Sequence, residues 1–112
     1  MGIEEVQNKK VLGMIGLSTK AGKLVSGTDA TIQEIEKNKV ALVIVAKDAS
    51  EKTKKNMKFI CDKSKINFIE FGEIENLSRA IGKNNKAIIG IKSKNIAIEI
   101  ERIIKGGDLL NG

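Results

Sequence analysis

The stretch VALVIVA, residues 40–46, decides the fold of this chain. It is an unbroken run of aliphatic and largely β-branched residues, which is typical of a strand that is buried on both faces. A strand of this kind needs one helix layer above it and another below it. We therefore expect residues 40–46 to lie in the middle of a sheet, and the flanking segments to supply the covering helices.

The segments before this run show helical spacing of their apolar residues. In the first, we expect Leu12, Ile15 and Thr19 to share one face, while Gly13 and Gly16 leave room for a neighbouring element. The predicted elements are a helix over residues 4–19, a strand over 23–26 and a helix over 28–38, which Thr28 can cap and which turns Ile32 and Ile35 inward.

The segments after this run continue the alternation of helix and strand. Asp48 and Ser50 stand where the next helix, over residues 51–65, would be capped, and Met57, Ile60 and Cys61 fall on its buried face. The later elements are a strand over 66–71, a loop over 72–75, a helix over 76–81, a strand over 87–91 and a last helix that Ser93 can cap and Gly106 ends, with Ile96, Ile100 and Ile103 facing the core. This order predicts an α/β sandwich with helices on both faces of a small sheet.

The composition fits one folded, basic domain. A chain of 112 residues with 41% hydrophobic side chains can bury a core, so we expect a single domain over residues 1–107 and a frayed tail over 108–112. Twenty basic and 14 acidic side chains give a net charge of +6, which favours polyanionic partners. Only three residues are aromatic, so we expect an aliphatic core and no base stacking on aromatic rings.

Several kinds of chemistry are excluded or disfavoured. The chain has no histidine and a single cysteine, Cys61, so it cannot form a His–Cys zinc site, a Ser–His–Asp triad or an internal disulfide. The stretch GLSTKAG, residues 16–22, does not match a phosphate-binding loop, because five residues separate its glycines and Leu24 follows Lys23. Acids such as Glu34 and Glu36 are expected to be solvated. We expect a non-enzymatic protein without cofactors.

The sequence also predicts where the protein resides. Its first residues lack the basic-then-apolar order of a signal peptide. Its longest apolar run, residues 40–46, is far shorter than the roughly 20 residues of a membrane-spanning helix. We therefore expect a cytoplasmic protein that does not associate with membranes.

The helix start at Gly27 and Thr28 is the strongest candidate binding site. The first amides of a helix have no intrahelical partner, so such an end attracts a phosphate or an electronegative base edge. The neighbouring polar residues are Lys23 before the helix and, as one stripe along it, Asp29, Gln33 and Lys37. An ordinary capped surface helix would show the same pattern, so these residues alone leave both interpretations open.

The stretch AGKLVSGTDATIQEIEKNKVALVIVAKDAS, residues 21–50, resembles the signature region of the kink-turn-binding ribosomal proteins of the L7Ae and L30e family, and most closely its small bacterial YlxQ-like branch. LSRAIGK, residues 77–83, is similar to the family's second contact region, and the strand KAIIGI follows it. The resemblance covers nearly the whole chain. It implies a three-layer α/β/α sandwich around a small mixed sheet of about four strands. It also implies binding of a sharply bent RNA, with the helix start in a widened groove and a later loop against an extruded base.

The resemblance also implies which residues contact RNA. By position, the glycine at the family's helix start falls on Gly27 and the residue after it on Thr28. Lys37 keeps the basic character of a further contact. Ile74 and Glu75 fall in the loop that would cover the extruded nucleotide.

Three positions depart from the family's pattern. Asp29, Ala30 and Gln33 stand where the RNA-binding members have asparagine, glutamate and lysine, respectively. A carboxylate only accepts hydrogen bonds, whereas guanine O6 and N7 need donors, so Asp29 cannot read guanine as asparagine does. Asp29 could accept from guanine N1 and N2 or from cytosine N4, and Gln33 could supply a donor. We expect weaker binding to a standard kink-turn and a related but altered target, with ribosomal RNA as one candidate.

The helix predicted over residues 51–65 carries six lysines, namely Lys52, Lys54, Lys55, Lys58, Lys63 and Lys65. A run of this kind is usually a solvated face. We therefore expect single Lys→Glu changes in this helix to leave the affinity for RNA nearly intact.

Two other functions remain open. The first is a substrate-recognition domain of the type attached to RNA ribose methyltransferases, although we expect no catalytic domain in this chain. The second is a protein–protein module of a ribosome-associated or RNA-processing complex, in which the segment around Ile74 docks a partner. The favoured interpretation is a monomer that binds structured RNA.

Overall fold

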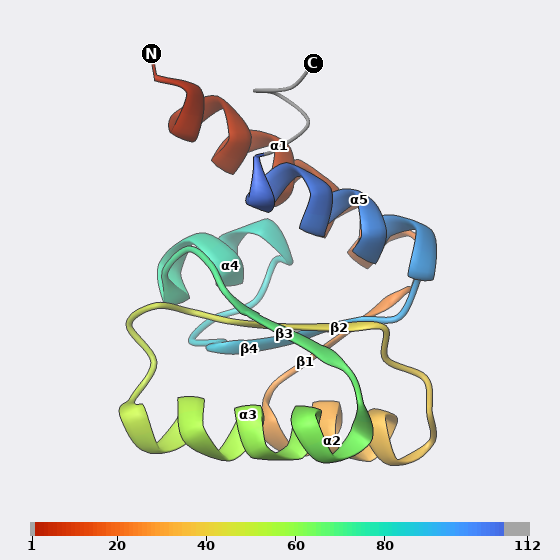
Figure 1. The fold of residues 1–112 in the computed structure, drawn as a ribbon. Coiled ribbons are helices and arrows are strands. Elements are labelled where there is room, and N and C mark those ends of the chain that lie inside the picture. Colours follow the sequence, from red (N-terminus) through yellow and green to blue (C-terminus); the bar gives the residue numbers. More distant parts are fainter. Residues whose placement is uncertain (1, 107–112) are drawn as a thin grey trace.

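The computed structural model of the chain describes residues 2–106, so the predicted tail over 108–112 lies outside the described residues. Helices and strands alternate along the described chain, as the sequence predicted (Figure 1). The elements are α1 (Ile3–Lys20), β1 (Leu24–Ser26), α2 (Thr28–Glu36), β2 (Leu42–Val45), α3 (Glu51–Ser64), β3 (Asn67–Glu70), α4 (Ile74–Ala80), β4 (Ile88–Ile91) and α5 (Lys94–Lys105).

The four strands form one mixed sheet in the order β1-β4-β2-β3. β2 is parallel to β3 and antiparallel to β4, and β4 is antiparallel to β1. Every residue of β2 is buried, so the prediction that residues 40–46 supply a central strand is confirmed. The small mixed sheet that the family resemblance implied is confirmed as well.

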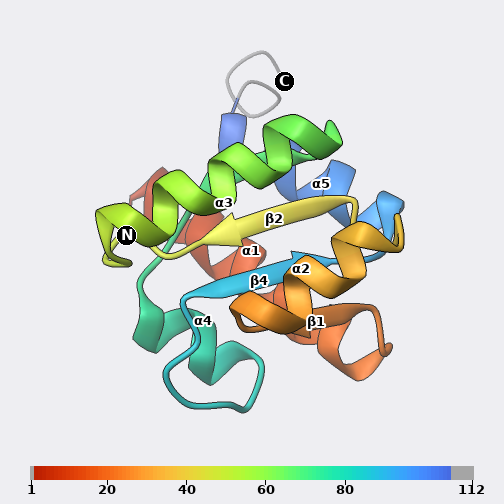
Figure 2. The same ribbon diagram turned by 90° about the horizontal axis from the view of Figure 1, so that it is seen from below.

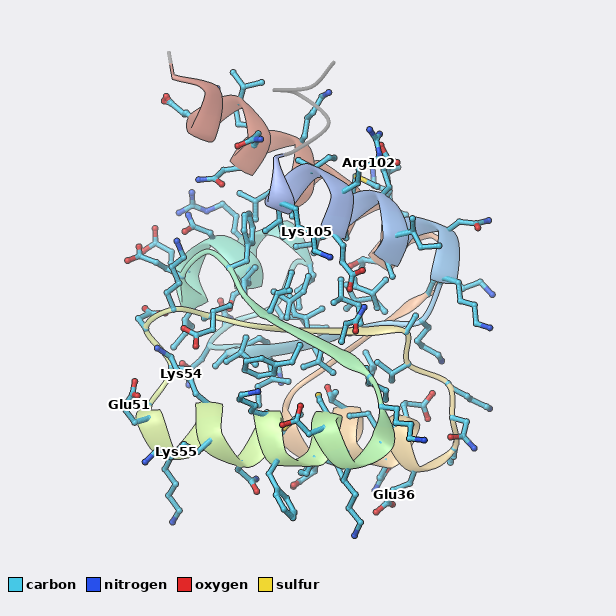
Figure 3. All side chains as sticks on the ribbon, in the orientation of Figure 1. Glu36, Glu51, Lys54, Lys55, Arg102 and Lys105 are labelled. Carbon is cyan, nitrogen blue, oxygen red and sulfur yellow. The ribbon has the colours of Figure 1, made fainter. Side chains whose placement is uncertain are left out.

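Helices cover both faces of the sheet. α1, α4 and α5 lie on one face, whereas α2 and α3 lie side by side on the other (Figures 1 and 2). Successive side chains of β2 point to opposite faces of the sheet. Leu42 and Ile44 pack into the first core, between the sheet and helices α1, α4 and α5, whereas Val43 and Val45 pack into the second core, between the sheet and helices α2 and α3. Side chains fill the space between the layers (Figure 3). The predicted α/β/α sandwich is therefore confirmed.

The second core contains the single cysteine. Cys61 packs with Met57 of the same helix, and both side chains are fully buried. Burial in apolar surroundings raises the pKa of the Cys61 thiol to about 11, so the thiol is protonated at neutral pH. The prediction that Cys61 fills the core is confirmed.

Glycines allow close approach at two places. A Cβ atom at Gly16 would lie 3.4 Å from the carbonyl oxygen of Ala80, so the predicted contact of α1 with a neighbour is with α4. A Cβ atom at Gly90 would lie 2.8 Å from Cγ1 of Val25, which explains the glycine in the buried strand β4. Gly13 has no such neighbour within 4 Å, so the prediction for this residue is wrong.

The buried face of α1 also differs from the prediction. Val11, Ile15 and Ser18 are fully buried, whereas Thr19 is exposed and donates its hydroxyl hydrogen to the carbonyl of Ile15 at 3.3 Å. Ser18 tolerates burial because its hydroxyl donates to the carbonyl of Met14 at 3.0 Å. The packed face therefore follows residues 11, 15 and 18 rather than 12, 15 and 19.

Two predicted caps take other roles. Gly27, rather than Thr28, is the N-cap of α2, because its φ of 93° and ψ of 156° suit glycine. Ser50 caps α3 as predicted, by accepting from the Thr53 amide at 3.1 Å. Asp48 instead accepts a hydrogen bond from the Ile74 amide at 2.8 Å. α4 therefore begins at Ile74, and the loop predicted over 72–75 is shorter than expected.

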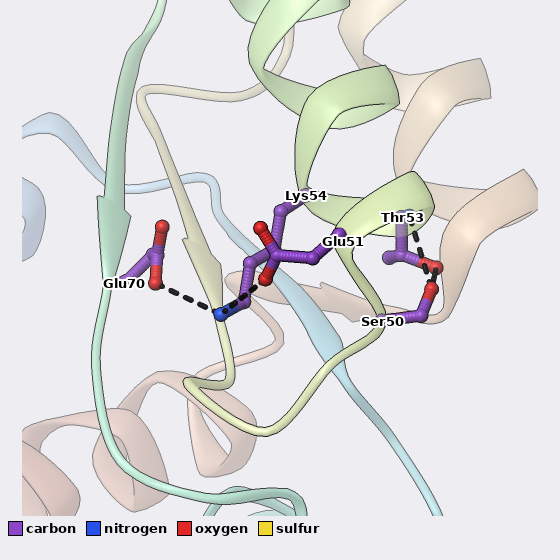
Figure 4. A network of polar contacts seen from close by, with 5 residues as sticks. All are labelled: Ser50, Glu51, Thr53, Lys54 and Glu70. Carbon is purple, nitrogen blue, oxygen red and sulfur yellow. Dashed lines mark hydrogen bonds and ion pairs between the residues drawn. The ribbon is translucent and has the colours of Figure 1, made fainter.

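Polar contacts fasten α3 to the edge strand β3. Lys54 forms ion pairs with Glu70 at 3.2 Å and with Glu51 at 3.4 Å (Figure 4). Partial burial disfavours the charged ammonium of Lys54, but the hydrogen bonds to Glu70 and Glu51 outweigh this effect and raise its pKa.

Among the helices within residues 2–106, none is long and apolar enough to cross a membrane.

Candidate nucleic-acid interface

The start of α2 presents backbone donors to solvent. The Gly27 amide is occupied, since it donates to the carbonyl of Ile88 at 2.9 Å. The first amide to bond within the helix belongs to Thr31, which donates to the carbonyl of Gly27 at 3.1 Å. Within residues 2–106, the amides of Thr28, Asp29 and Ala30 have no backbone acceptor, and all three residues are exposed. These amides can bind an anion or a base edge.

The connection between α4 and β4, residues 82–86, lies beside this helix start. Gly82 and Asn85 have φ values of 70° and 54°, which bend the connection sharply. The hydroxyl of Ser78 accepts a hydrogen bond from the Lys86 amide at 2.7 Å and donates to the carbonyl of Lys86 at 3.4 Å. A Cβ atom at Gly27 would lie 3.6 Å from Nζ of Lys86, so this ammonium contacts the start of α2. Sequence reasoning missed Lys86.

An open cavity of about 810 Å³ lies between α4 and the same connection. It is lined by Asp48, Ile74, Glu75, Ser78, Arg79, Gly82, Lys83, Asn84 and Asn85. The structure thus brings Ile74 and Glu75, which were predicted to lie in a loop, to this cavity from the first turn of α4. In Figure 2 the connection lies at the same end of the sheet as the start of α2.

The charges around this cavity are only partly matched. Glu75 pairs with Arg79 at 3.1 Å, and Asp48 is occupied by the Ile74 amide. No ion pair within the described part of the chain involves Lys83 or the half-buried Lys86. This end of the molecule therefore offers ammonium groups without an acidic partner, and backbone amides without a backbone acceptor, among residues 2–106.

A second cavity, of about 380 Å³, lies between α2 and α3. It is lined by Thr28, Lys52, Thr53, Asn56 and Met57. Because the starts of both helices lie at this end of the sheet, Thr28 stands close to polar side chains of α3 (Figure 2). The predicted stripe of Asp29, Gln33 and Lys37 is exposed along α2.

Two predicted site residues lie away from this end. Lys23 precedes β1, whose first residue pairs with Ile91, whereas Gly27 bonds to Ile88 at the opposite end of β4. Lys37 is the C-cap of α2, about 14 Å along the helix from Thr28. The structure therefore joins Gly27, Thr28, Asp29 and Ala30 to Lys86 and does not bring Lys23 or Lys37 to them.

At the far end of α2, one carboxylate is paired with two lysines. Glu34 forms ion pairs with Lys92 at 2.9 Å and with Lys37 at 3.6 Å. The hydrogen bond from Lys92, together with nearby positive charges, holds the pKa of the Glu34 carboxyl below its ordinary value.

Among residues 2–106, no group of three His, Cys, Asp or Glu side chains is arranged to hold a metal ion.

Known proteins share this sequence and architecture. The model of the ribosomal protein L7Ae/L30e/S12e/Gadd45 family matches residues 9–100. "RNA-binding protein YlxQ" of Enterococcus faecium is 38% identical over 108 residues, which cover 93% of this chain and 100% of that protein. "RNA-binding protein YlxQ" of Bacillus subtilis (strain 168) is 31% identical over 84 residues, which cover 75% of this chain and 84% of that protein.

Solved structures agree with this assignment. A protein of unknown function from Bacillus halodurans superposes with a TM-score of 0.82 at 30% identity, covering 86% of this chain and 97% of that chain. The Giardia lamblia 15.5kD RNA binding protein superposes with a TM-score of 0.75 at 16% identity, covering 93% and 89%, and so shares the fold. The family match over residues 9–100 and the identity to the YlxQ proteins confirm the resemblance seen in residues 21–50. The chain belongs to the ribosomal protein L7Ae/L30e/S12e/Gadd45 family.

Proposed function

We propose that this chain binds a structured, kink-turn-like RNA at the end of the sheet where α2 begins, and that it does so without catalysing a reaction. The names of its YlxQ relatives as RNA-binding proteins support an RNA partner. The net charge of +6 supports binding to a polyanion. In this proposal the chain acts in the cytoplasm, on ribosomal RNA or on RNA that is being processed.

The observation that carries the proposal is the contact of Lys86 with the start of α2. Nζ of Lys86 lies 3.6 Å from the position of a Cβ atom on Gly27, beside the exposed amides of Thr28, Asp29 and Ala30. A phosphate or a base edge at this point would receive backbone hydrogen bonds and a charge-assisted bond together. An ordinary capped surface helix would not need this second source of positive charge.

The cavity next to this point suits an extruded nucleotide. Its volume of about 810 Å³ exceeds what a single base needs, and Ile74 offers an apolar wall. Asn84 and Asn85 supply amide groups that can both donate and accept hydrogen bonds, and Lys83 can contact the phosphate. These residues extend the predicted contact region, which ended at Lys83.

The departures at Asp29, Ala30 and Gln33 support an altered RNA target. Asp29 is exposed and carries one of the free amides, so its carboxylate is accessible to a base edge bound at this helix start. It accepts hydrogen bonds and repels phosphates, whereas asparagine at this position would offer a donor. We therefore propose that the bound sequence presents an amino or imino donor where a standard kink-turn presents guanine acceptors.

Filter binding to total cellular RNA tests the proposal with variants at the two ends of α2. Thr28→Glu adds a negative charge beside the free amides, and Lys37→Glu reverses a charge on the exposed stripe. We expect Thr28→Glu to bind clearly less RNA than the unaltered protein, and Lys37→Glu to lose much less, because Lys37 lies at the far end of the helix. Lys94→Glu, at the start of α5 on the other helix layer, is the matched control and should bind normally.

The same assay addresses the alternative, a protein–protein module. The RNA proposal fails if the unaltered protein binds cellular RNA no better than it binds a non-specific duplex. It also fails if both α2 variants bind RNA as well as the control variant Lys94→Glu does. The segment around Ile74 would then be the candidate protein-docking surface.

A further inference from the structure

The outer face of α3 combines positive charge with an exposed aromatic ring. α3 packs on the sheet through Met57 and Cys61. Its opposite face carries, at spacings of three or four residues, the side chains of Lys52, Lys55, Phe59 and Lys63. Phe59 is 67% exposed, which is the largest exposure of any large hydrophobic side chain among the described residues. We call these four residues the α3 stripe.

The lysines of the α3 stripe have no acidic partner in the part of the chain that the structure describes. Lys54 and Lys58, which lie outside the stripe, form ion pairs with Glu70 and Asp62, respectively. In contrast, no ion pair within residues 2–106 involves Lys52, Lys55 or Lys63. Figure 3 shows the difference at the start of the helix, where Lys54 points toward the sheet and Lys55 lies on the outer side.

The α3 stripe is continuous with the candidate site at the start of α2. Lys52 lines the cavity of about 380 Å³ that Thr28 also lines. From Lys52 to Lys63 the stripe extends about 17 Å along the helix axis. Adjacent phosphates of a stacked strand are about 3.4 Å apart along its axis, so the stripe can accommodate several nucleotides. An RNA bound at Thr28 could therefore continue over the outer face of α3.

We propose that the α3 stripe binds unpaired nucleotides that flank the structured element held at the start of α2. Phe59 stacks on a base, while Lys52, Lys55 and Lys63 contact phosphates. This inference rests on the proposed RNA-binding function. It also revises two expectations from the sequence, that these lysines form a solvated face and that no base stacks on an aromatic ring, because the sequence did not show that Phe59 is exposed among the lysines.

The chemistry of the stripe favours RNA over a protein partner. Proteins bind unpaired nucleic acid by combining a basic surface that follows the backbone with aromatic rings on which bases stack. Protein–protein interfaces are instead depleted in lysine. The ring of Phe59 and its lysine neighbours therefore match an unpaired strand.

The absence of tryptophan from the chain provides a direct test. Phe59→Trp would introduce the only indole, whose fluorescence reports stacking. The probes are a kink-turn RNA with blunt ends and the same RNA with an unpaired extension of about six nucleotides on each strand in turn, long enough to follow the stripe. We expect quenching by one extended RNA and little by the blunt RNA. Ile98→Trp, on the exposed surface of α5, is the control and should not be quenched.

Affinity measurements provide the second arm. Phe59→Ala should weaken binding to the extended RNA about fivefold or more, the low end of what base stacking contributes, and leave binding to the blunt RNA unchanged. Phe59→Leu keeps an apolar side chain without an aromatic ring and should lose affinity as well. Lys55→Gln should reduce the salt dependence of log K by about 0.7, whereas Lys94→Gln should not.

The two proposals fail in different ways. If the unaltered protein binds neither RNA, the proposed function fails, and this inference with it. If the protein binds both RNAs equally well, Phe59→Trp is not quenched and Phe59→Ala alters neither affinity, only the role of the α3 stripe is overturned. Binding of a protein at Phe59 would give that second result.

Discussion

The two ends of α2 differ in whether their polar groups have partners among the described residues. At its start, the amides of residues 28–30 have no backbone acceptor among the described residues, and Lys86 adds an ammonium without an acidic partner there. At its other end, Glu34 pairs with both Lys37 and Lys92. Glu34 is thus paired within the described residues at one end, whereas the other end offers free backbone donors and an unpaired ammonium beside the exposed Asp29 carboxylate.

In the proposed function, the start of α2 contributes to RNA binding, whereas its far end contributes to the stability of the fold. Exposed donors at a helix start are satisfied by water until a ligand with acceptors replaces it. At the other end, Glu34 pairs with Lys92, which follows β4, and with Lys37, so these two ammonium groups already have an acidic partner. The comparison predicts that changes at the two ends will affect different measurements.

The largest effect is expected from Gly27→Ala. Gly27 has φ 93° and ψ 156°, a conformation that costs other residues about 1–3 kcal/mol. We expect a loss of this size in the free energy of unfolding, measured with urea. Displacement of the free amides should also weaken RNA binding about tenfold, equivalent to about 1.4 kcal/mol.

Gly13→Ala is the matched control for this change. A Cβ atom at Gly13 meets no such neighbour within 4 Å, and the residue lies in the helix α1. The substitution should raise the free energy of unfolding by up to about 1 kcal/mol and leave RNA binding unchanged. If Gly27→Ala binds RNA as well as Gly13→Ala does, the start of α2 is not the binding site.

Asp29→Asn should have the next largest effect, and in the opposite direction. It supplies a donor next to the free amides and removes a negative charge. We expect affinity for a standard kink-turn to rise about fivefold or more, since one well-placed base contact contributes about 1–3 kcal/mol. Asp29→Ala removes the charge without adding a donor, so a gain of the same size in that variant would show that charge alone matters.

A smaller effect is expected when Lys86→Gln is compared with Lys37→Gln. Lys86 lies at the open end of α2, whereas Lys37 is paired with Glu34 at 3.6 Å. Removal of one phosphate contact lowers the salt dependence of log K by about 0.9. We expect this change for Lys86→Gln and a clearly smaller one for Lys37→Gln. An equal or larger change for Lys37→Gln would place RNA at the wrong end of the helix.

The smallest effect is expected from Glu34→Gln, and on stability alone. The folded-state pKa of Glu34 lies below its ordinary value of 4.5, so its carboxylate stabilises the fold above that pH. This stabilisation disappears as the pH falls through the lowered pKa. The difference in unfolding free energy between the two proteins should therefore be present at pH 7 and vanish in acid, whereas RNA affinity should not change.

Glu36→Gln is the control for the pH experiment. Glu36 is an exposed neighbour in α2 for which no ion pair occurs within residues 2–106. Its replacement should give no comparable pH-dependent difference. The account of the far end would be contradicted if Glu34→Gln and Glu36→Gln behaved alike between pH 7 and pH 3.

Local patterns in the sequence were enough to predict the central strand and both helix layers. The run at residues 40–46 could only be buried on both faces, and Ser50 and Ser93 cap the helices that follow them. The pattern could not give the strand order, because β4 enters between β1 and β2 through contacts distant in sequence. Periodicity also placed Thr19 wrongly in the core. Residues 12, 15 and 19 and residues 11, 15 and 18 both have helical spacing, and the structure buries the second set.

The candidate site was only partly predictable for the same reason. Gly27 and Thr28 mark a helix start in the sequence itself, but Lys86 reaches them only because β4 pairs with β1. Asp48 lies where a local helix cap was predicted, yet its carboxylate accepts a hydrogen bond from the amide of Ile74, which is 26 residues away in the sequence. Neither contact leaves a signal in the spacing of nearby residues.

The most direct test is to record the backbone amide NMR signals of the ¹⁵N-labelled protein during titration with a kink-turn RNA. The account predicts that the amide signals of residues 28–30 and 82–86 shift most, and that those of Lys23, Lys37 and Lys92 shift little. Large shifts at Lys23, Lys37 and Lys92 with unchanged signals for residues 28–30 would contradict it.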